Sequence, residues 1–370
     1  MNNLNTLHGV LKLPAFFPDA TRAVVRAIDS KDIENCGIEG LVVNTFHLLS
    51  KPGARVISGQ GGIHKFMNWK GHIISDSGGF QLFSLLANSS KLGSVSKKGF
   101  VYRPNKGDGK TILTPEKCIQ KQFQFASDIM VCLDYCIHPE VPYDKQKESV
   151  KYTVLWADKC KSEFDKLLRE KEIDNNARPL LFAVVQGGSD FNLRRECAER
   201  LIEIGFDGYG YGGWPIVAGN QLSETLEFVS QLLPKSKPKY ALGIGKPENV
   251  VRCAKMGYSL FDCVIPTRDA RHGRLYIFSE EPEGSSLAGS DFYKCLYLMD
   301  KKHINDKRPL EEGCGCLCCR GYSRAYLYHL FKIKDALAYR LATIHNLRFY
   351  ARLIEAIRLR IDMPRVVKLT

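Results

Sequence analysis

Two carboxylates stand in segments whose other residues suit contact with a ligand. Asp76 ends a β-rich run and is followed by Gly78 and Gly79, which let the backbone approach a bound molecule closely. A tight turn with Asp76 as a helix N-cap explains the same segment equally well. Asp262 lies within the apolar run Leu260–Val264, where an ionised carboxylate is costly unless it is hydrogen-bonded or takes part in chemistry. These two segments are the first candidates for a reactive site.

Side chains suited to a nucleic acid follow both carboxylates. Phe80 could stack on a base, although an aromatic residue after a turn is more often part of the core. After the second carboxylate comes a basic loop with Arg268, Arg271, His272 and Arg274, which suits a phosphate backbone held near a reacting sugar. A solvated run of charges is the alternative interpretation of this loop.

Three further β-rich runs end in groups that could read a purine edge. Asp134 offers a carboxylate, Gln186 an amide, and the pair Gly212 and Gly213 backbone N–H donors. Guanine presents N1–H and N2–H2 as donors and O6 as an acceptor, so this mixture would read it well. Each group could equally be an ordinary buried polar residue with a local hydrogen-bond partner.

A cysteine cluster near the C-terminus has the spacing of a structural zinc site. The predicted ligands are Cys314, Cys316, Cys319 and His345. Three thiolates and one imidazole fill a tetrahedral shell, which leaves no open position for a substrate. Cys318 competes with Cys319 as a ligand and His329 with His345, and the spacing favours Cys319 and His345.

The elements that must position these groups alternate between short strands and amphipathic helices. The eight β-rich runs are Lys12–Pro18, Leu41–Thr45, His72–Ser75, Ile129–Leu133, Leu180–Val185, Gly208–Tyr211, Tyr240–Ile244 and Leu260–Val264. Segments such as Pro115–Ser127, Asn192–Ile204 and Pro247–Met256 carry apolar residues three and four apart, as crossover helices do. Eight such units predict an α/β fold, a (β/α)8 TIM barrel whose strand ends face the active site. An open doubly wound sheet is the rival fold.

The strand rhythm stops after about Ser279, which divides the chain into two predicted regions. Residues 1–279 are expected to form the barrel, and 280–370 a zinc-binding subdomain with C-terminal helices that complete it. Two polar stretches, Asn88–Asp108 and Lys161–Arg178, are predicted to be exposed insertions.

Composition narrows the class of protein. Lysine and arginine number 53 against 40 acidic residues, a net charge of +13 that favours a polyanionic partner or an anionic surface. The 13 cysteines are mostly scattered, unlike a secreted disulfide framework. No apolar run is long enough to span a membrane, and the N-terminus does not resemble a signal peptide. A cytoplasmic location is therefore expected.

Taken together, the ordered motifs resemble those of bacterial-type tRNA-guanine transglycosylases, also called queuine tRNA-ribosyltransferases. The motifs are Asn44–Leu48, Phe66–Trp69, Asp76–Gln81, Val185–Gly188, Gly243–Pro247, Phe261–Val264 and the cysteine–histidine block. They run through most of the chain, and so many in order are highly specific. The resemblance implies a TIM barrel with a zinc-bearing insertion, in agreement with the strand count and the thiol spacing.

The resemblance also implies roles for individual residues. Asp262 would be the nucleophile and Asp76 the general acid and base, in a double displacement like that of a retaining glycosidase. Asp134, Gln186 and Gly213 would read the base, with Phe80 as a stacking residue. The implied contacts with tRNA are Gly243, Gly245, Lys246, Thr267, Arg268 and Arg271. The wobble guanine of tRNAs with G-U-N anticodons would be exchanged for a 7-deazaguanine base by a homodimer with one structural zinc ion per subunit.

The sequence departs from the family pattern beside the predicted pocket. Trp214–Val217 reads Trp-Pro-Ile-Val where the family usually has Leu-Ala-Val-Gly, and Pro215 removes an N–H. Both 7-aminomethyl-7-deazaguanine and queuine therefore remain possible substrates. Phe80 replaces a frequent tyrosine, and Tyr135 a frequent glutamate.

Three rival functions agree less well with the sequence. Asp76 and Asp262 together argue against a non-catalytic tRNA-binding subunit. The chain extends only to Thr370, which argues against the archaeal-type enzyme with its extra C-terminal RNA-binding domains. A zinc-dependent nucleobase deaminase would need a His-x-Glu motif paired with Pro-Cys-x-x-Cys, and the sequence has neither.

Overall fold

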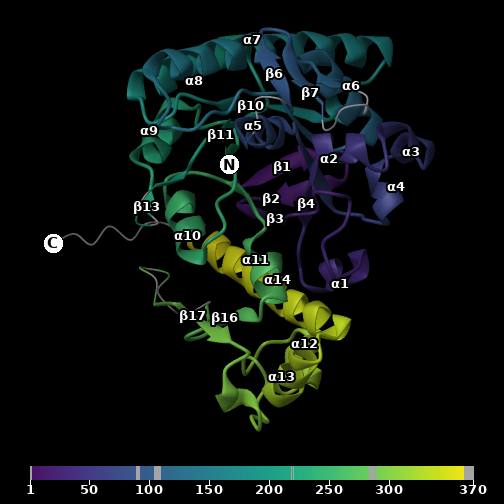
Figure 1. Ribbon diagram of the computed structural model, residues 1–370, viewed down its shortest axis with the longest axis vertical. Helices are drawn as coiled ribbons and strands as arrows, with labels where there is room; N and C mark the ends of the chain where they lie inside the picture. Colours follow the sequence, from purple (N-terminus) through teal and green to yellow (C-terminus); the bar gives the residue numbers. More distant parts are fainter. Residues whose placement is uncertain are drawn as a thin grey trace, which may run out of the picture.

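An eight-stranded parallel sheet forms the centre of the molecule (Figure 1). The computed structural model describes residues 2–88, 92–103, 110–217, 219, 221–282, 287, 289 and 291–361. The eight strands are β3 (Ala15–Pro18), β4 (Gly40–Asn44), β5 (His72–Asp76), β9 (Ile129–Val131), β10 (Leu180–Val185), β11 (Gly208–Tyr211), β14 (Lys239–Ala241) and β15 (Leu260–Cys263). They pair in the order β3-β15-β14-β11-β10-β9-β5-β4. Each matches one of the eight predicted runs, with ends that differ by a few residues.

The two edge strands of this sheet meet through a looser seam. Asp19, just beyond β3, bridges to Val42 of β4, and the Ala20 N–H donates to the Val42 carbonyl at 2.8 Å. The sheet is therefore a nearly closed barrel, which confirms the predicted (β/α)8 fold over the doubly wound alternative.

Helices follow the strands and cover the barrel. They are α1 (Ser30–Asn35), α2 (Thr45–Ser50), α3 (Ala54–Gly59), α4 (Ile63–Met67), α5 (Gly79–Asn88), α6 (Pro115–Phe125), α7 (Tyr143–Glu170), α8 (Phe191–Ile204), α9 (Glu224–Leu232), α10 (Pro247–Lys255), α11 (Ile265–Arg271), α12 (Leu317–Gly321), α13 (Arg324–Lys332) and α14 (Ala336–Ile361). Capping fixes where several begin: Thr114 accepts the Lys117 N–H before α6, and Asp190 accepts the Leu193 N–H before α8. The three predicted crossover helices correspond to α6, α8 and α10.

The barrel interior is filled by large side chains that need glycine on a neighbouring strand. A Cβ at Gly40 would lie 2.1 Å from the ring of Phe17, and one at Gly208 would lie 2.4 Å from the ring of Phe182. A hairpin of β1 (Asn3–Thr6) and β2 (Gly9–Lys12) adds Leu4 and Leu11 to this core. The hairpin therefore contributes to the packed interior of the barrel.

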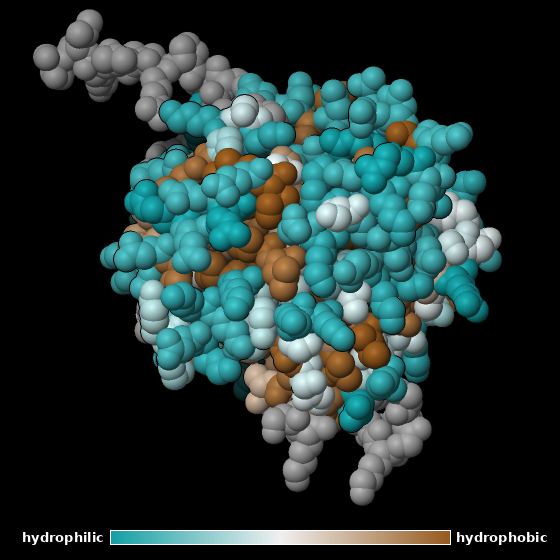
Figure 2. All heavy atoms as spheres, turned by 90° about the horizontal axis from the view of Figure 1, so that it is seen from above, coloured by the Kyte–Doolittle hydropathy of each residue, from teal (hydrophilic) through white to brown (hydrophobic). Residues whose placement is uncertain are grey.

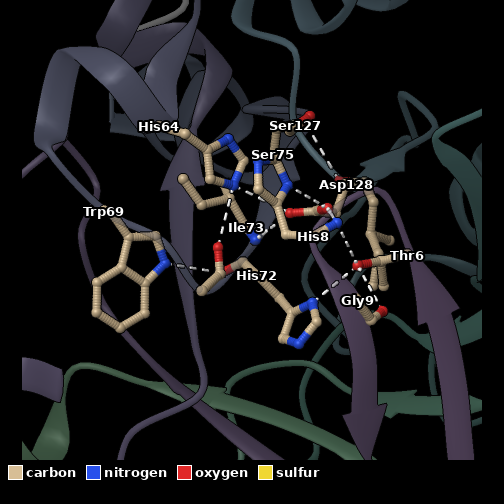
Figure 3. A network of polar contacts seen from close by, with 12 residues as sticks. Thr6, His8, Gly9, His64, Trp69, His72, Ile73, Ser75, Ser127 and Asp128 are labelled. Carbon is tan, nitrogen blue, oxygen red and sulfur yellow. Dashed lines mark hydrogen bonds and ion pairs between the residues drawn. The ribbon is translucent and has the colours of Figure 1, made fainter.

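Asp128, at the start of β9, fastens this hairpin to the barrel (Figure 3). One carboxylate oxygen accepts the backbone N–H of His8 at 3.1 Å and lies 2.8 Å from its Nδ1. The other accepts the Ile73 N–H at 2.8 Å and lies 3.1 Å from His64 Nε2. The rings of His8 and His64 stack at 3.6 Å. These hydrogen bonds outweigh the cost of burial and lower the pKa of Asp128 to about 2.

The two polar stretches predicted as exposed insertions are largely structured. In the first, β7 (Gly99–Tyr102) pairs with β6 (Gly93–Ser96) on one side and with β8 (Thr111–Leu113) on the other, and Phe100 is fully buried. Residues 89–91 and 104–108 of that stretch lie outside the described residues. In the second, α7 continues to Glu170 with Phe164 and Leu168 buried. The prediction of exposure was wrong for these residues: Phe100 lies in a small sheet that packs on the core, and most charges of the second stretch lie on the solvent-facing side of α7, while Glu163 is buried and accepts the Gln120 amide.

After α11 the chain forms a hairpin followed by α12, α13 and α14; the hairpin, α12 and α13 are drawn in the lower part of Figure 1. Strands β16 (Arg274–Phe278) and β17 (Tyr293–Tyr297) pair antiparallel, and the predicted boundary at residues 279 and 280 falls between them. Helix α14 contacts β3, α10 and α11, so it lies over the strand at which the barrel closes.

The surface is mostly hydrophilic when seen from above, with apolar side chains gathered in patches (Figure 2). Among the helices of the described residues, none is long and apolar enough to cross a membrane.

Candidate active site

A cavity of about 360 Å³ opens at the carboxyl ends of the barrel strands. Its lining includes Asp76, Asp134, Gln186, Gly213 and Asp262, together with Phe80 and Gly243. Strand ends far apart in the sequence thus bring the predicted catalytic and base-reading residues into one pocket, as a barrel requires.

Asp76 ends β5 and is half-buried in the pocket wall. Burial, followed by the charges of Asp134 and Asp262, raises its pKa to about 7, while the backbone N–H groups of the Ser77–Gly78 turn oppose the rise. Asn44, at the end of β4, donates its side-chain amide to Asp76 at 2.6 Å. A carboxyl group with a pKa near neutrality can both give and take a proton.

Asp262 enters the same pocket from β15. Its Oδ1 accepts the Tyr240 hydroxyl at 2.7 Å and the Gly243 N–H at 3.0 Å, which leaves Oδ2 without a hydrogen bond to the described residues. Burial raises its pKa to about 6, and these two donors limit the rise. Near pH 7 the group is mostly ionised and oriented, as a nucleophilic carboxylate must be.

Asp134 and Gln186 form a hydrogen-bonded pair on the pocket floor. Gln186 Nε2 donates to Asp134 Oδ2 at 2.6 Å, and both residues are buried. Burial raises the pKa of Asp134 to about 6, and the Gln186 amide counteracts it. Beside them, Gly213 has a φ of +96°, a conformation that favours glycine and turns its backbone toward the cavity. The floor therefore offers an anionic acceptor next to neutral donors.

Aromatic rings form one rim of the pocket. Phe80 is 46% exposed, which rules out the core interpretation weighed for it. Its ring lies 5.6 Å from that of Trp214, which also contacts Phe83 at 6.0 Å and His138 at 5.0 Å. A flat base entering this cavity would meet an exposed ring on this side.

The residues expected to contact tRNA divide into exposed and buried groups. Arg268 and Gly243 are exposed, and Gly243 also lines the pocket. Lys246 is half-buried and directly precedes α10. Thr267 is 1% exposed and its hydroxyl donates to the Val264 carbonyl at 3.2 Å, so its side chain is not available to RNA. Gly245 is also buried, and its carbonyl accepts the Tyr350 hydroxyl.

The predicted basic loop after Asp262 is a helix rather than a loop. Arg268 and Arg271 lie on α11, and the pKa of Arg271 is lowered by burial and by the nearby charge of Arg26. Arg274 begins β16, where Asp269 lies 3.5 Å from its guanidinium. Because Pro266 stands in the first turn, the segment can begin a helix directly after the strand.

The predicted zinc ligands gather into one buried cluster. His345 Nδ1 lies 3.9 Å from Cys314 Sγ, 3.9 Å from Cys316 Sγ and 3.3 Å from Cys319 Sγ. Zinc bonds of ordinary length in a tetrahedron would separate sulfur and nitrogen by about 3.6 Å. His345 Nε2 lies 2.8 Å from the Tyr276 carbonyl, which holds Nδ1 free to bind a metal. The four ligands can hold a metal ion and fit zinc, and the rivals Cys318 and His329 are outside the cluster.

Two pocket residues that hydrogen-bond to the predicted catalytic carboxylates were not predicted as site residues from the sequence. Asn44 contacts Asp76, and Tyr240 contacts Asp262. Asn44 ends a strand and could have been found by the reasoning applied to Asp76. Tyr240 reads as a core residue of its strand, and nothing in the sequence pattern distinguishes it.

Comparisons with known proteins agree with this geometry. The model of a family described as "Queuine tRNA-ribosyltransferase" matches residues 1–369. A queuine tRNA-ribosyltransferase of Syntrophobacter fumaroxidans is 38% identical over 356 residues, covering 96% of this chain and 88% of that protein. Those of Caldanaerobacter subterraneus and a Psychrobacter species are 39% and 38% identical, covering 99% and 97% of this chain and 90% and 88% of those proteins.

Proposed function

Because the chain belongs to the queuine tRNA-ribosyltransferase family, whose members are tRNA-guanine transglycosylases and hence pentosyltransferases, we propose that it replaces the wobble guanine of G-U-N anticodons with a 7-deazaguanine base. The observation that carries the proposal is the pair of carboxylates Asp76 and Asp262 in one pocket with different surroundings. One has a pKa of about 7 and the other, held by two donors, of about 6. Two carboxyl groups with separated pKa values suit a double displacement.

In the first displacement, Asp262 Oδ2 would attack C1′ of the ribose while the bond from C1′ to N9 of guanine breaks. Its Oδ1 is occupied by Tyr240 and Gly243, which fix the direction of the free oxygen. Asp76 would give its proton to the departing base. In the second displacement it would take a proton from the incoming base, whose ring nitrogen then attacks C1′ and releases Asp262. The tRNA chain stays intact throughout.

The pocket floor would read the base. Asp134 would accept N1–H and N2–H2, while Gln186 Nε2 and the Gly213 N–H would donate to O6. The target nucleotide must leave its stack to reach this depth, which suits a flexible anticodon loop better than a duplex. Arg268, Arg271, Lys246 and Gly243 would contact the RNA backbone. A net charge of +13 supports such a partner.

The 7-substituent of the incoming base would lie against Trp214–Ile216. Trp214 packs on Phe83 and His138, and Pro215 has no N–H to offer. A competition between 7-aminomethyl-7-deazaguanine and queuine for the same tRNA identifies the preferred base. Repeating it with Trp214→Ala tests whether this ring sets the preference, since the variant then gains most with the larger base.

The decisive test is incorporation of labelled guanine into unmodified tRNA with a G-U-N anticodon. We expect label at the wobble position with the native protein and none with Asp262→Asn, because an amide is a poor nucleophile. Asp165→Asn, which removes a partly exposed carboxylate of α7 that pairs with Lys161, is the matched control and should exchange like the native protein. Salt must be held constant because phosphate contacts make binding depend on ionic strength.

A second candidate is a non-catalytic tRNA-binding subunit. Binding of tRNA by the native protein without any exchange would favour it over the enzyme. The two half-buried, hydrogen-bonded carboxylates argue against it, because they would then have no task that offsets the cost of partial burial.

We also propose a homodimer, a cytoplasmic location and a division into a barrel region, 1–279, and a zinc-binding region, 280–370. Exposed apolar side chains on the second region support self-association: Tyr297, Met299, Ile304, Leu317, Tyr326 and Ile333. None of the 13 cysteines forms a disulfide, as expected in a reducing compartment. Zinc would be structural, one ion per subunit. It would join α12 to α14 at a distance from the pocket and supply no chemistry to the exchange.

A further inference from the structure

Arg194 is a buried cation for which the proposed mechanism has no role. It lies near the start of α8 and is 1% exposed. Among the described residues it hydrogen-bonds to carbonyl groups and forms no ion pair with a carboxylate. Burying a guanidinium without a counter-charge is costly, and the positive end of the helix dipole increases that cost. The reason for its position must therefore lie in the groups it contacts.

Its guanidinium joins two neighbouring strand ends. Nε donates to the Gly188 carbonyl at 2.9 Å, and Nη1 donates to the carbonyls of Val185 at 2.7 Å and Gly212 at 2.9 Å. The guanidinium carbon also lies 4.2 Å from the centre of the Tyr211 ring. One side chain thus fixes both segments that carry base-reading groups, the one after β10 with Gln186 and the one after β11 with Gly213.

The contact with Gly212 bears directly on the Gly213 N–H. The Gly212 carbonyl and the Gly213 N–H belong to one peptide group, so a charged donor on the oxygen makes the N–H a stronger donor. A Cβ on Gly213 would lie 3.3 Å from Arg194 Nη2 and 3.5 Å from Gln186 Oε1, so the guanidinium lies directly behind this peptide. On the pocket side, the Gly213 N–H faces the thiol of Cys136, where its hydrogen bond opposes the rise in pKa caused by burial.

We propose that Arg194 is a positioning residue that orients and polarises the Gly212–Gly213 peptide for the carbonyl oxygen of the base. The inference rests on the proposed function and adds to it a source of charge stabilisation. When the bond from C1′ to N9 breaks, its electron pair stays with the base and spreads toward O6 until the proton of Asp76 arrives. A strengthened N–H at O6 stabilises that charge, although Arg194 itself does not touch the base.

The test compares guanine with 6-thioguanine in native protein and in Arg194→Met. Both bases keep the donors that Asp134 would accept, but sulfur is a weaker acceptor than O6. We expect Arg194→Met to raise KM for guanine about tenfold, the cost of losing a charge-assisted hydrogen bond. The KM for 6-thioguanine should change less, so the preference for guanine shrinks, and the KM for tRNA should stay the same.

Arg195→Met is the matched control, because it removes an exposed cation from the next position of the same helix. Its base preference should equal that of the native protein. Equal losses for guanine and 6-thioguanine in Arg194→Met would overturn the proposal and leave a merely structural role. If Arg194→Met does not fold, Arg194→Lys serves instead. Lysine keeps the positive charge but lacks the planar guanidinium that donates to three carbonyl groups. An unchanged base preference in this variant would again overturn the proposal.

Failure of the proposed function is recognised separately. If the native protein exchanges no guanine, calorimetry still measures how tightly each variant binds the two free bases. An unchanged ratio of the two affinities in Arg194→Met would then overturn this inference on its own.

Discussion

Replacing Asn44 with serine should move the alkaline limb of the pH–rate profile to higher pH. Asn44 donates to Asp76 at 2.6 Å and so stabilises its ionised form. The same side chain caps α2 by accepting the His47 N–H at 3.2 Å, and serine retains capping ability while it is too short to reach Asp76. The pKa of Asp76, about 7 in the native protein, should therefore rise.

The size of the effect follows from the hydrogen bond that is lost. A hydrogen bond to a charged group contributes about 1.5 kcal/mol at the lower end, which corresponds to roughly one pKa unit. At pH 8 the protonated fraction of Asp76 would rise from about one-tenth to about one-half, so kcat/KM at pH 8, relative to its maximum, should increase about fivefold.

The assay is kcat/KM for unmodified tRNA between pH 5 and pH 9 at constant ionic strength. This parameter reports the free enzyme, with Asp76 protonated and Asp262 ionised. The acid limb, set by Asp262 with a pKa of about 6, should stay in place and serves as the internal control. An alkaline limb that stays fixed or moves to lower pH would refute the reasoning.

Three other predictions concern the metal, the hairpin and the RNA surface. Cys319→Ser should reduce bound zinc below one ion per chain and lower Tm, as measured by metal analysis and thermal unfolding; full retention of both would contradict the ligand assignment. The Asp128 pKa of about 2 is below the value of about 3.9 for an unfolded chain, so this group stabilises the fold above pH 4 and loses that contribution as pH falls through 2. Asp128→Asn should accordingly lower the free energy of unfolding by about 2 kcal/mol in urea at pH 7, with the difference vanishing near pH 2. Arg268→Ala should weaken tRNA binding and reduce the slope of log Kd against log salt by about one, whereas an unchanged slope would exclude a phosphate contact.

The barrel was predictable because each strand is short, apolar and followed by a helix of clear period. The error at Lys161–Arg178 has a simple cause. In α7, Phe164 and Leu168 are spaced by one helical turn, but the charges between them dominate the composition of the segment. The charged composition of the segment thus concealed the helical spacing of its buried residues, Phe164 and Leu168.

The site was predictable where a polar residue ends a strand, as Asp76 does, or follows it closely, as Asp134 does after β9. It was not predictable where the function of a side chain depends on register between strands. Tyr240 pairs with Leu260 in the sheet, and only that register brings its hydroxyl to Asp262 two residues further along the next strand. Arg194 belongs to the same class, because in the sequence it is one of several charges on an amphipathic helix.

Helix α14 has a consequence for how the protein is made. It carries the ligand His345, and Tyr350, whose hydroxyl binds the Gly245 carbonyl in the segment beside Asp262. Near its end, Arg358 donates to the Pro14 carbonyl at 2.8 Å, just before the first barrel strand. A ribosome therefore synthesises all eight strands before the helix that covers their closure has emerged. The nascent barrel must wait with an uncovered seam, which makes this interval the point at which chaperones and proteases have most access to the chain.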